Sequence, residues 1–187
     1  LAQLAFWLLA ATDGHAKNFS IRHGRAGRFG LTPLYDVLSA WPVIGDGPNQ
    51  IAYRRAKLAM PLRGQKNTHA PLADIQLRHW QRLAAVCGPG VWERMVRMVL
   101  EVDAALDIVE RELPVGFPER TCKRIAAGMR RHAAQFVRAL DQFGALWPGV
   151  TFVGPYTNQL SHRDDYLTLK DASNNIADEV HYFDDGR

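Results

Sequence analysis

The chain has little cysteine and no long apolar run, and each absence argues against a class of protein. Its 187 residues include two cysteines, Cys87 and Cys122, which lie far apart and form no Cys-x-x-Cys pair. Isolated thiols argue against a disulfide scaffold and favour a reducing compartment, so we expect a cytoplasmic location. No apolar stretch approaches the roughly 20 residues that a membrane helix needs, and we therefore expect no membrane contact.

Internal repeats, low-complexity segments and phosphate-binding glycine loops are also missing. Gly24, Gly27 and Gly30 recur at a spacing of three, without the strand-loop-helix context or the Gly-Lys-Ser/Thr ending of a P-loop. The segment Gly64-Gln65-Lys66 fails the same test. We interpret all of these glycines as turn residues.

What is present is an ordinary globular composition with an uneven charge. Apolar residues make up 47% and charged residues 22% of the chain, which fits one substantial domain. Residues 1–144 hold 20 basic and 12 acidic side chains, whereas residues 145–187 hold 3 basic and 7 acidic ones. The excess of basic side chains in residues 1–144 could bind a nucleotide, an acidic protein or DNA. Alternatively, it could form a solvated arginine-rich surface. The first residue is leucine, so we expect the sequence to begin within a longer protein.

Periodicity predicts a mainly α fold with one short β-hairpin. Apolar residues at helical spacing predict a helix that starts at Leu1 and ends near Thr12. Alternation on either side of a glycine-rich turn predicts a hairpin over residues 19–31. Prolines and glycines predict loops over residues 41–73, and further helices are expected over residues 73–86, 91–113 and 118–143. Residues 144–187 change in character, and we treat them as an unassigned C-terminal extension.

The most informative segment is residues 11–20, Ala-Thr-Asp-Gly-His-Ala-Lys-Asn-Phe-Ser. Asp13 precedes Asn18 by five positions, and Asp36 follows within Leu34-Tyr35-Asp36-Val37. The catalytic loop of protein kinases has an Asp and an Asn at this spacing, and its metal-binding Asp comes later in the chain. The pattern therefore predicts phosphoryl transfer from a metal-bound nucleotide. We expect Pro33 to set up a turn that brings Asp36 back toward the loop that carries Asp13 and Asn18.

Each residue of this pattern has a predicted role. Asp13 is the candidate catalytic base for a substrate hydroxyl, while Asn18 and Asp36 are candidate magnesium ligands. His15 and Lys17 are candidate contacts to the nucleotide phosphates. The alternatives are structural, because Asp-Gly is a common turn pair, asparagine often caps backbone and an exposed lysine needs no function.

Two other interpretations remain open at this level. Asp13, His15 and His23 could bind a transition metal, although their spacing matches no known zinc pattern. The Asp-x-His-x-x-Asn core also occurs in phosphotransferases that act on lipids or small molecules.

The wider sequence resembles the HipA family of serine/threonine kinase toxins. The match includes residues 11–21, the continuation Leu-Thr-Pro-Leu-Tyr-Asp-Val-Leu-Ser-Ala at 31–40, Lys57-Leu58-Ala59-Met60, and Phe117-Pro118-Glu119. It extends over about residues 1–143 and corresponds to the helical, kinase-like C-terminal lobe of that family. The resemblance implies transfer of the ATP γ-phosphate to serine or threonine of a protein substrate, with Mg²⁺ as the cofactor.

The resemblance also implies partners. Members of the family pair with a HipB-like helix-turn-helix antitoxin, so any contact with DNA is expected to be indirect, through that antitoxin. A kinase also needs a β-rich lobe with a glycine-rich loop and a strand lysine, and neither motif occurs in this sequence. We therefore expect the fragment to be inactive alone. The alternative is a non-catalytic remnant that binds an antitoxin or another protein.

Overall fold

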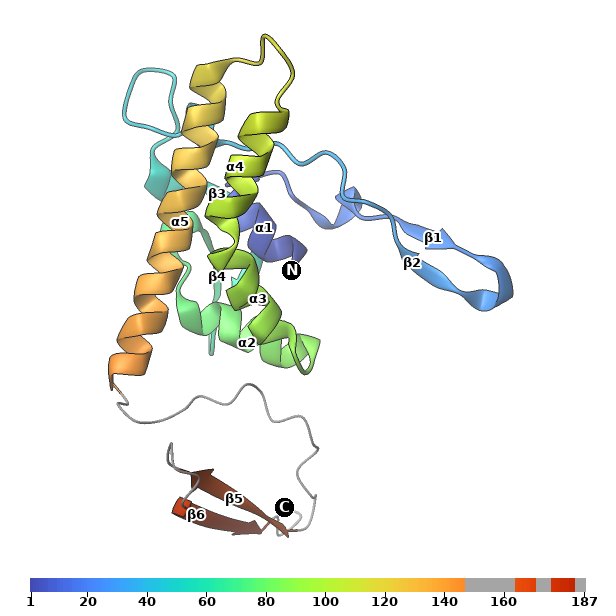
Figure 1. Cartoon of the computed structure of the whole chain (residues 1–187), viewed down its shortest axis with the longest axis vertical. Helices are drawn as coiled ribbons and strands as arrows, with labels where there is room; N and C mark the ends of the chain where they lie inside the picture. The colour runs from blue at the N-terminus through green and yellow to red at the C-terminus, as the bar shows by residue number, and fades with distance from the viewer. Residues whose placement is uncertain (147–163, 171–175, 184–187) are drawn as a thin grey trace.

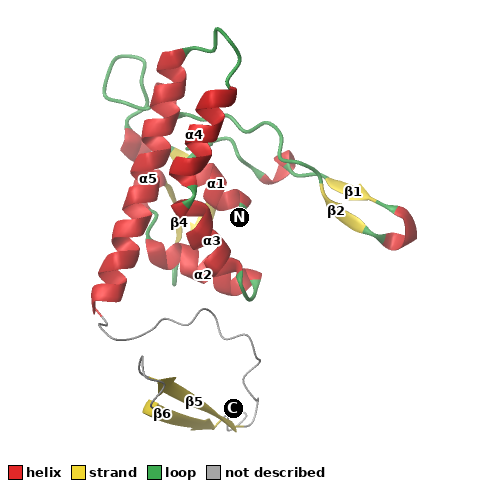
Figure 2. Cartoon of the chain, in the orientation of Figure 1, coloured by secondary structure: helices red, strands yellow, loops and turns green. Residues whose placement is uncertain are grey.

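The computed structural model describes residues 1–146, 164–170 and 176–183. Five α-helices and three two-stranded antiparallel hairpins lie in these ranges (Figure 2). The helices are α1 Ala2–Leu8, α2 Leu77–Cys87, α3 Val91–Leu100, α4 Val102–Glu112 and α5 Glu119–Leu146, and the strands are β1 Ile21–His23, β2 Phe29–Leu31, β3 Lys57–Arg63, β4 Thr68–Pro71, β5 Asp164–Lys170 and β6 Ile176–Phe183. The predicted helical class is therefore confirmed in its coarse form, and the kinase-like lobe stays a prediction.

Helix α1 lies in the middle of the helical body, because it is apolar around almost its whole circumference. Leu4, Phe6, Trp7 and Leu8 are all buried. The helix contacts α5 on one side and β3 on another, where Gln3 donates a hydrogen bond of 2.6 Å to a β3 carbonyl. The segment that leads into residues 11–20 is thus anchored in the core.

A buried histidine on α5 connects three parts of this core. The His132 ring stacks on Trp7 at 4.0 Å between centroids, and its Nδ1 lies 2.7 Å from the Trp7 carbonyl oxygen. Its Nε2 lies 2.8 Å from the hydroxyl of Tyr53. Burial lowers the pKa of His132 to about 4, against a weaker opposing effect of the Trp7 hydrogen bond. The imidazole is therefore neutral at pH 7.

Trp41 joins the same region through a close backbone approach. Its indole N–H donates 2.8 Å to the carbonyl of Leu8, and its ring lies directly against Gly128 of α5. A Cβ at position 128 would overlap the indole, so only glycine fits there. Through these contacts of Trp41, the segment after Asp36 packs between α1 and α5.

Residues 41–73 differ from the prediction, which assigned them to loops. They contain the β3–β4 hairpin, in which Leu58, Met60 and Leu62 alternate toward the core. Pro61 concealed this strand in the sequence, but proline is tolerated in an edge strand, and the register is irregular between Lys57 and Leu62. The prediction of loops over this whole segment was therefore wrong.

The predicted helices are present with one exception, although α1 ends at Leu8 and not near Thr12, and α2 begins at Leu77 and not at residue 73. The helix expected over residues 91–113 is interrupted at Glu101, where φ is −86° and ψ is −1°, and forms α3 and α4. No glycine or proline marks this position. Arg130 of α5 contacts Asp103 at 2.8 Å and Asp107 at 3.5 Å, which holds α4 beside α5.

The hairpin predicted over residues 19–31, next to the motif of residues 11–20, is confirmed. Strands β1 and β2 pair with Ile21 opposite Leu31 and His23 opposite Phe29. All six strand residues are exposed, and the hairpin projects away from the helical body (Figure 1). It therefore contributes no core residue.

Part of the C-terminal extension also lies in the described ranges. The extension contains short runs of aromatic and β-branched residues, and those at 166–169 and 180–183 fall in the paired strands β5 and β6. The run at 151–153 lies outside the described residues, and the boundary at 143/144 stays a prediction. Among the described helices, none combines the length and apolarity that crossing a bilayer requires.

Candidate active site

The loop that follows α1 is shaped by contacts with the core. Ala10 adopts a left-handed φ of 49° and ends the helix, and the Gly14 N–H then donates to the Ala11 carbonyl at 3.2 Å. Gly14 packs on the Phe6 ring so closely that an added Cβ would lie 2.5 Å from it. A short 3-10 helix, Ala16–Asn18, completes the loop. The conformation of residues 13–18 is thus fixed by the buried helix that precedes them.

Asn18 connects the two segments of the sequence motif. Its side chain is almost fully buried, with 4% exposure. The amide Nδ2 donates to the Asp13 carbonyl oxygen at 3.2 Å, and it lies 3.4 Å from both the carbonyl oxygen and the carboxylate Oδ2 of Asp36. A single side chain therefore holds Asp36 next to the loop that carries Asp13.

Contacts on both sides of Asp36 fix its position. On one side, the Tyr35 hydroxyl donates to the Lys17 carbonyl at 3.1 Å and lies 2.8 Å from the Ser20 hydroxyl. On the other, the Ser39 hydroxyl donates to the Leu9 carbonyl at 2.7 Å. Asp36 itself has a φ of 56°, a left-handed conformation that aspartate and asparagine tolerate better than most residues.

The other predicted side chains are arranged more openly. The Asp13 carboxylate is 74% exposed, and its Oδ1 lies 3.7 Å from Nε2 of His15. The Nδ1 of His15 is buried and has no hydrogen-bond partner among the described residues. Lys17 is exposed, and only its backbone carbonyl contributes to the contacts described above. The five predicted residues thus lie in one loop and the adjacent turn, with Asn18 and Asp36 in direct contact.

The chemistry of the donor set fits magnesium. Asn18 and Asp36 supply an amide and a carboxylate, and both carry the hard oxygen atoms that Mg²⁺ prefers. In this structure the Asn18 amide presents its Nδ2 to Asp36, so the amide would have to turn over for its Oδ1 to bind the same ion. Magnesium commonly binds one or two carboxylates together with substrate phosphates, so two protein ligands are sufficient in number. The exposed Asp36 carboxylate leaves room for the phosphates.

The transition-metal alternative finds no support. Within the described ranges, no three His, Cys, Asp or Glu side chains gather closely enough to hold a metal ion. His23, its third proposed ligand, lies on the exposed strand β1.

Sequence reasoning missed the groups that position the site. These groups are the hydroxyls of Ser20 and Tyr35 and the Phe6 ring beneath Gly14. They position the loop and the turn, but none of them is a predicted catalytic or metal-binding group. The one available signal was Tyr35, an aromatic residue directly before Asp36.

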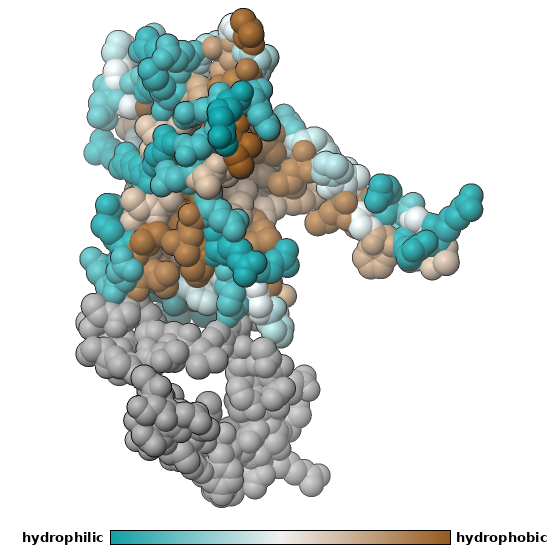
Figure 3. All heavy atoms as spheres, viewed as in Figure 1, coloured by the Kyte–Doolittle hydropathy of each residue, from teal (hydrophilic) through white to brown (hydrophobic). Residues whose placement is uncertain are grey.

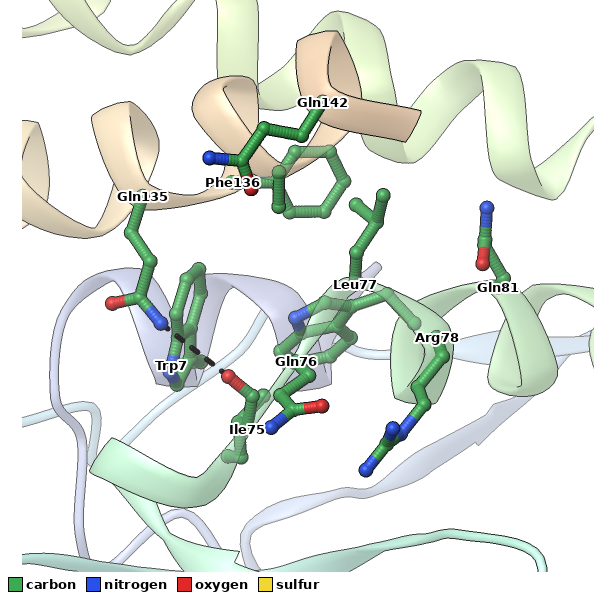
Figure 4. A pocket seen from close by; sticks show the side chains of 11 residues that line it. Trp7, Ile75, Gln76, Leu77, Arg78, Gln81, Gln135, Phe136 and Gln142 are labelled. Atoms are coloured by element: carbon green, nitrogen blue, oxygen red, sulfur yellow. Dashed lines mark hydrogen bonds between the residues drawn. The ribbon is translucent and has the colours of Figure 1, made fainter. Parts of the chain in front are cut away.

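The site is distinct from a mainly apolar cavity on the helical body. That cavity has a volume of about 400 Å³ and lies between α2 and α5, where Gln135 donates to the Ile75 carbonyl at 3.4 Å (Figure 4). None of the residues that line it belongs to the loop of residues 11–20 or to the turn at Asp36.

A comparison with protein families agrees with the motif. The model of the HipA-like C-terminal domain matches residues 1–112, which is more than half of the chain. The match contains all five predicted site residues and ends before the position near 143 that the sequence resemblance suggested. The chain belongs to the family of HipA-like C-terminal domains.

Proposed function

We propose that this chain is the C-terminal catalytic lobe of a HipA-like toxin kinase, which transfers the γ-phosphate of ATP to serine or threonine of a protein. The observation that carries the proposal is the Asn18 side chain, which joins the loop of Asp13 to Asp36. The family is associated with kinase activity, and its matched region contains the whole motif.

The exposure of the Asp13 carboxylate supports a role for it as the general base. Its carboxylate is exposed beside a loop whose backbone is fixed by other groups, so it is free to accept a hydrogen bond from an incoming hydroxyl. In the proposed reaction, the hydroxyl oxygen attacks the γ-phosphorus, Asp13 takes the proton, and ADP leaves. Proper alignment of these atoms supplies most of the rate in this class of reaction.

Asn18 and Asp36 would hold magnesium, which would neutralise charge on the transferred phosphoryl group. His15 would donate to a phosphate oxygen, a role compatible with its proximity to Asp13. Lys17 is exposed on the same loop and would add positive charge near the ATP phosphates. The β-rich lobe with a glycine-rich loop and strand lysine would bind the rest of the nucleotide, so residues 1–187 alone are expected to be inactive.

The partners follow from the same assignment. The proposed protein substrate and a HipB-like helix-turn-helix antitoxin would bind this kinase in the cytoplasm, where ATP is available, and DNA would be contacted through the antitoxin. Four basic residues, Arg22, His23, Arg25 and Arg28, lie on the projecting hairpin next to the loop and would favour an acidic partner segment.

A second candidate is a binding module without catalysis. It is favoured by the apolar side chains on the hairpin, because Ile21 is 59%, Phe29 77% and Leu31 66% exposed. Figure 3 shows apolar and hydrophilic surface side by side on the projecting arm. A module of this kind would need neither Asp13 nor Asp36. Substitution of these aspartates therefore separates the two functions.

The test of the kinase assignment is Asp36→Asn in the full-length product of the gene that encodes this chain. Asparagine keeps the left-handed backbone conformation and the size of the side chain but removes the negative charge. We expect phosphorylation of the protein substrate, measured with radiolabelled ATP, to fall by about 10²-fold or more at 1 mM Mg²⁺, a loss typical of a missing electrostatic contact. Higher Mg²⁺ or Mn²⁺ concentrations are expected to restore part of the rate.

Asp74→Asn is the matched control, because Asp74 is exposed and lies outside the site. It should retain the wild-type rate. Equal phosphorylation by wild type and Asp36→Asn at every metal concentration would refute the kinase assignment and leave the binding module.

A further inference from the structure

We propose that the turn between β3 and β4, together with the first turns of α2, forms a second site that binds the phosphate group of a small phosphate monoester. The pocket has a volume of about 530 Å³. Lys66, Arg78 and Arg82 line it together with His69 and His79, and it has no acidic residue in its lining. None of these residues belongs to the candidate active site.

Among the described residues, the positive charges of the pocket have no counter-charges. Lys66, Arg78 and Arg82 are exposed, and none forms an ion pair with another residue in the part of the chain that the structure describes. Arg78 and Arg82 are four residues apart on α2, a spacing at which like charges repel each other. In Figure 4 the guanidinium of Arg78 extends away from Phe136 and Gln142, so it does not cover α5. A bound anion would offset this repulsion.

A buried imidazole supplies a fixed hydrogen-bond donor in the same place. His79 is 2% exposed, and its Nδ1 accepts a hydrogen bond of 3.1 Å from the backbone N–H of Gln76. Burial lowers the pKa of His79, and the neighbouring His69 and Arg78 act in the same direction, so the ring is neutral at pH 7. A neutral ring whose Nδ1 accepts must carry its proton on Nε2.

That proton faces another donor. The Nε of Arg78 lies 3.5 Å from Nε2 of His79, and with the proton on Nε2 both nitrogen atoms are donors. A buried donor without an acceptor costs free energy, whereas an anion oxygen beside the pair would accept from both nitrogen atoms. The buried His79 therefore points to an acceptor that is negatively charged.

The surrounding backbone favours the same ligand. Residues 77–79 form the first turn of α2, where the helix dipole is positive. His69 stacks on His79 at 4.1 Å between ring centroids, and this arrangement requires Gly64, because a Cβ there would lie 2.7 Å from the His69 ring. The turn Gly64-Gln65-Lys66, which lacks the P-loop pattern, thus places a lysine over the first turn of a helix.

A phosphate dianion matches these features better than a carboxylate or a nucleic acid. Three cations and a neutral donor converge on one pocket, and a phosphate has enough acceptor oxygens to contact all of them. Nucleic-acid backbones instead need positive charges spread along a surface. The volume leaves space for a small organic group on the phosphate, so free phosphate and phosphate monoesters share the proposed chemistry.

The experiment titrates the full chain with inorganic phosphate, and separately with O-phosphoserine, while the amide and histidine ring ¹⁵N signals are recorded. We expect a dissociation constant of about 1 mM or tighter, with signal changes at residues 64–69 and 76–82. The ring signals should show the proton on Nε2 of His79 before phosphate is added. Stronger binding of O-phosphoserine would identify a monoester, and equal or stronger binding of phosphate would identify the free ion.

The matched variants are Arg78→Gln and Arg82→Gln, with Arg94→Gln on α3 as the control. All three positions are exposed, so folding should be preserved, which unfolding midpoints will verify. We expect each pocket variant to weaken phosphate binding about tenfold and the control to leave it unchanged. A proton on Nδ1 of His79, an equal effect of Arg94→Gln, or binding of duplex DNA without binding of phosphate would overturn the proposal.

Discussion

Phosphorylation of the protein substrate is expected to fall by about 10² to 10⁴-fold when Asp13→Asn is made in the full-length protein, the range that a general base contributes. The folded state should be unaffected. The Asp13 carboxylate is 74% exposed and its one close charged neighbour is His15 at 3.7 Å, whereas the contact that organises the loop uses the Asp13 backbone carbonyl. The substitution keeps that carbonyl, so activity and stability are expected to separate.

The measurement is the initial rate of phosphate transfer at saturating Mg²⁺, together with the urea unfolding midpoint. Asp13→Ala is a useful second variant, because an asparagine before Gly14 can deamidate back to aspartate. Unlike the loss in Asp36→Asn, this loss should not be recovered by additional metal, since Asp13 is a proposed base and not a ligand. Wild-type rates in both variants would remove Asp13 from the mechanism.

The second large effect concerns the pH dependence of folding. The free energy of unfolding is expected to decrease as the pH falls from about 6.5 to about 4. The pKa of His132 is about 4 in the folded protein because the ring is buried, and 6.5 is its ordinary value. Between these values the unfolded chain binds more protons than the folded one, so the free energy of unfolding rises with pH. The full loss is about 3 kcal/mol, of which about 2 kcal/mol falls between pH 6.5 and pH 5.

A loss of about 3 kcal/mol is a large part of the free energy of unfolding of a domain, which is typically about 5 to 15 kcal/mol. Urea unfolding at a series of pH values from 7.5 to 5 measures the slope directly. His132→Gln should be less stable at pH 7.5, because the contacts with Trp7 and Tyr53 are weakened. The slope of its unfolding free energy against pH should be smaller than that of the wild type by the equivalent of about one proton. A variant slope equal to that of the wild type would assign the pH dependence to other groups.

How far the sequence predicted this fold depends on the range of the interactions. The β1–β2 hairpin and most helices follow from local patterns, such as the alternation around Gly24 and Gly27. The β3 strand was hidden by Pro61, whose effect depends on whether the strand is at an edge. The role of His132 was not predictable, because its partners Trp7 and Tyr53 lie 125 and 79 residues away in the sequence.

In the candidate site too, local spacing was predictable from the sequence and contacts between distant segments were not. The spacing of Asp13, Asn18 and Asp36 predicted that these three side chains would gather. In the structure the side chains of Asn18 and Asp36 are in contact, whereas Asp13 contacts Asn18 through its backbone carbonyl. The sequence did not show that Asn18 would turn its Nδ2 toward Asp36, or that the Tyr35 hydroxyl would hold the turn in place. These details depend on hydrogen bonds between segments 15 to 18 residues apart.

A paramagnetic titration tests the proposed magnesium site most directly. Mn²⁺ replaces Mg²⁺ at oxygen ligands and broadens NMR signals of nearby nuclei, so even weak binding to the isolated chain is detectable. We predict that the amide signals of residues 13–18 and 35–37 broaden first in the wild type, and that Asp36→Asn removes this preference. Broadening that instead begins at the acidic cluster of Asp103, Asp107 and Glu110, and is the same in both proteins, would contradict the account.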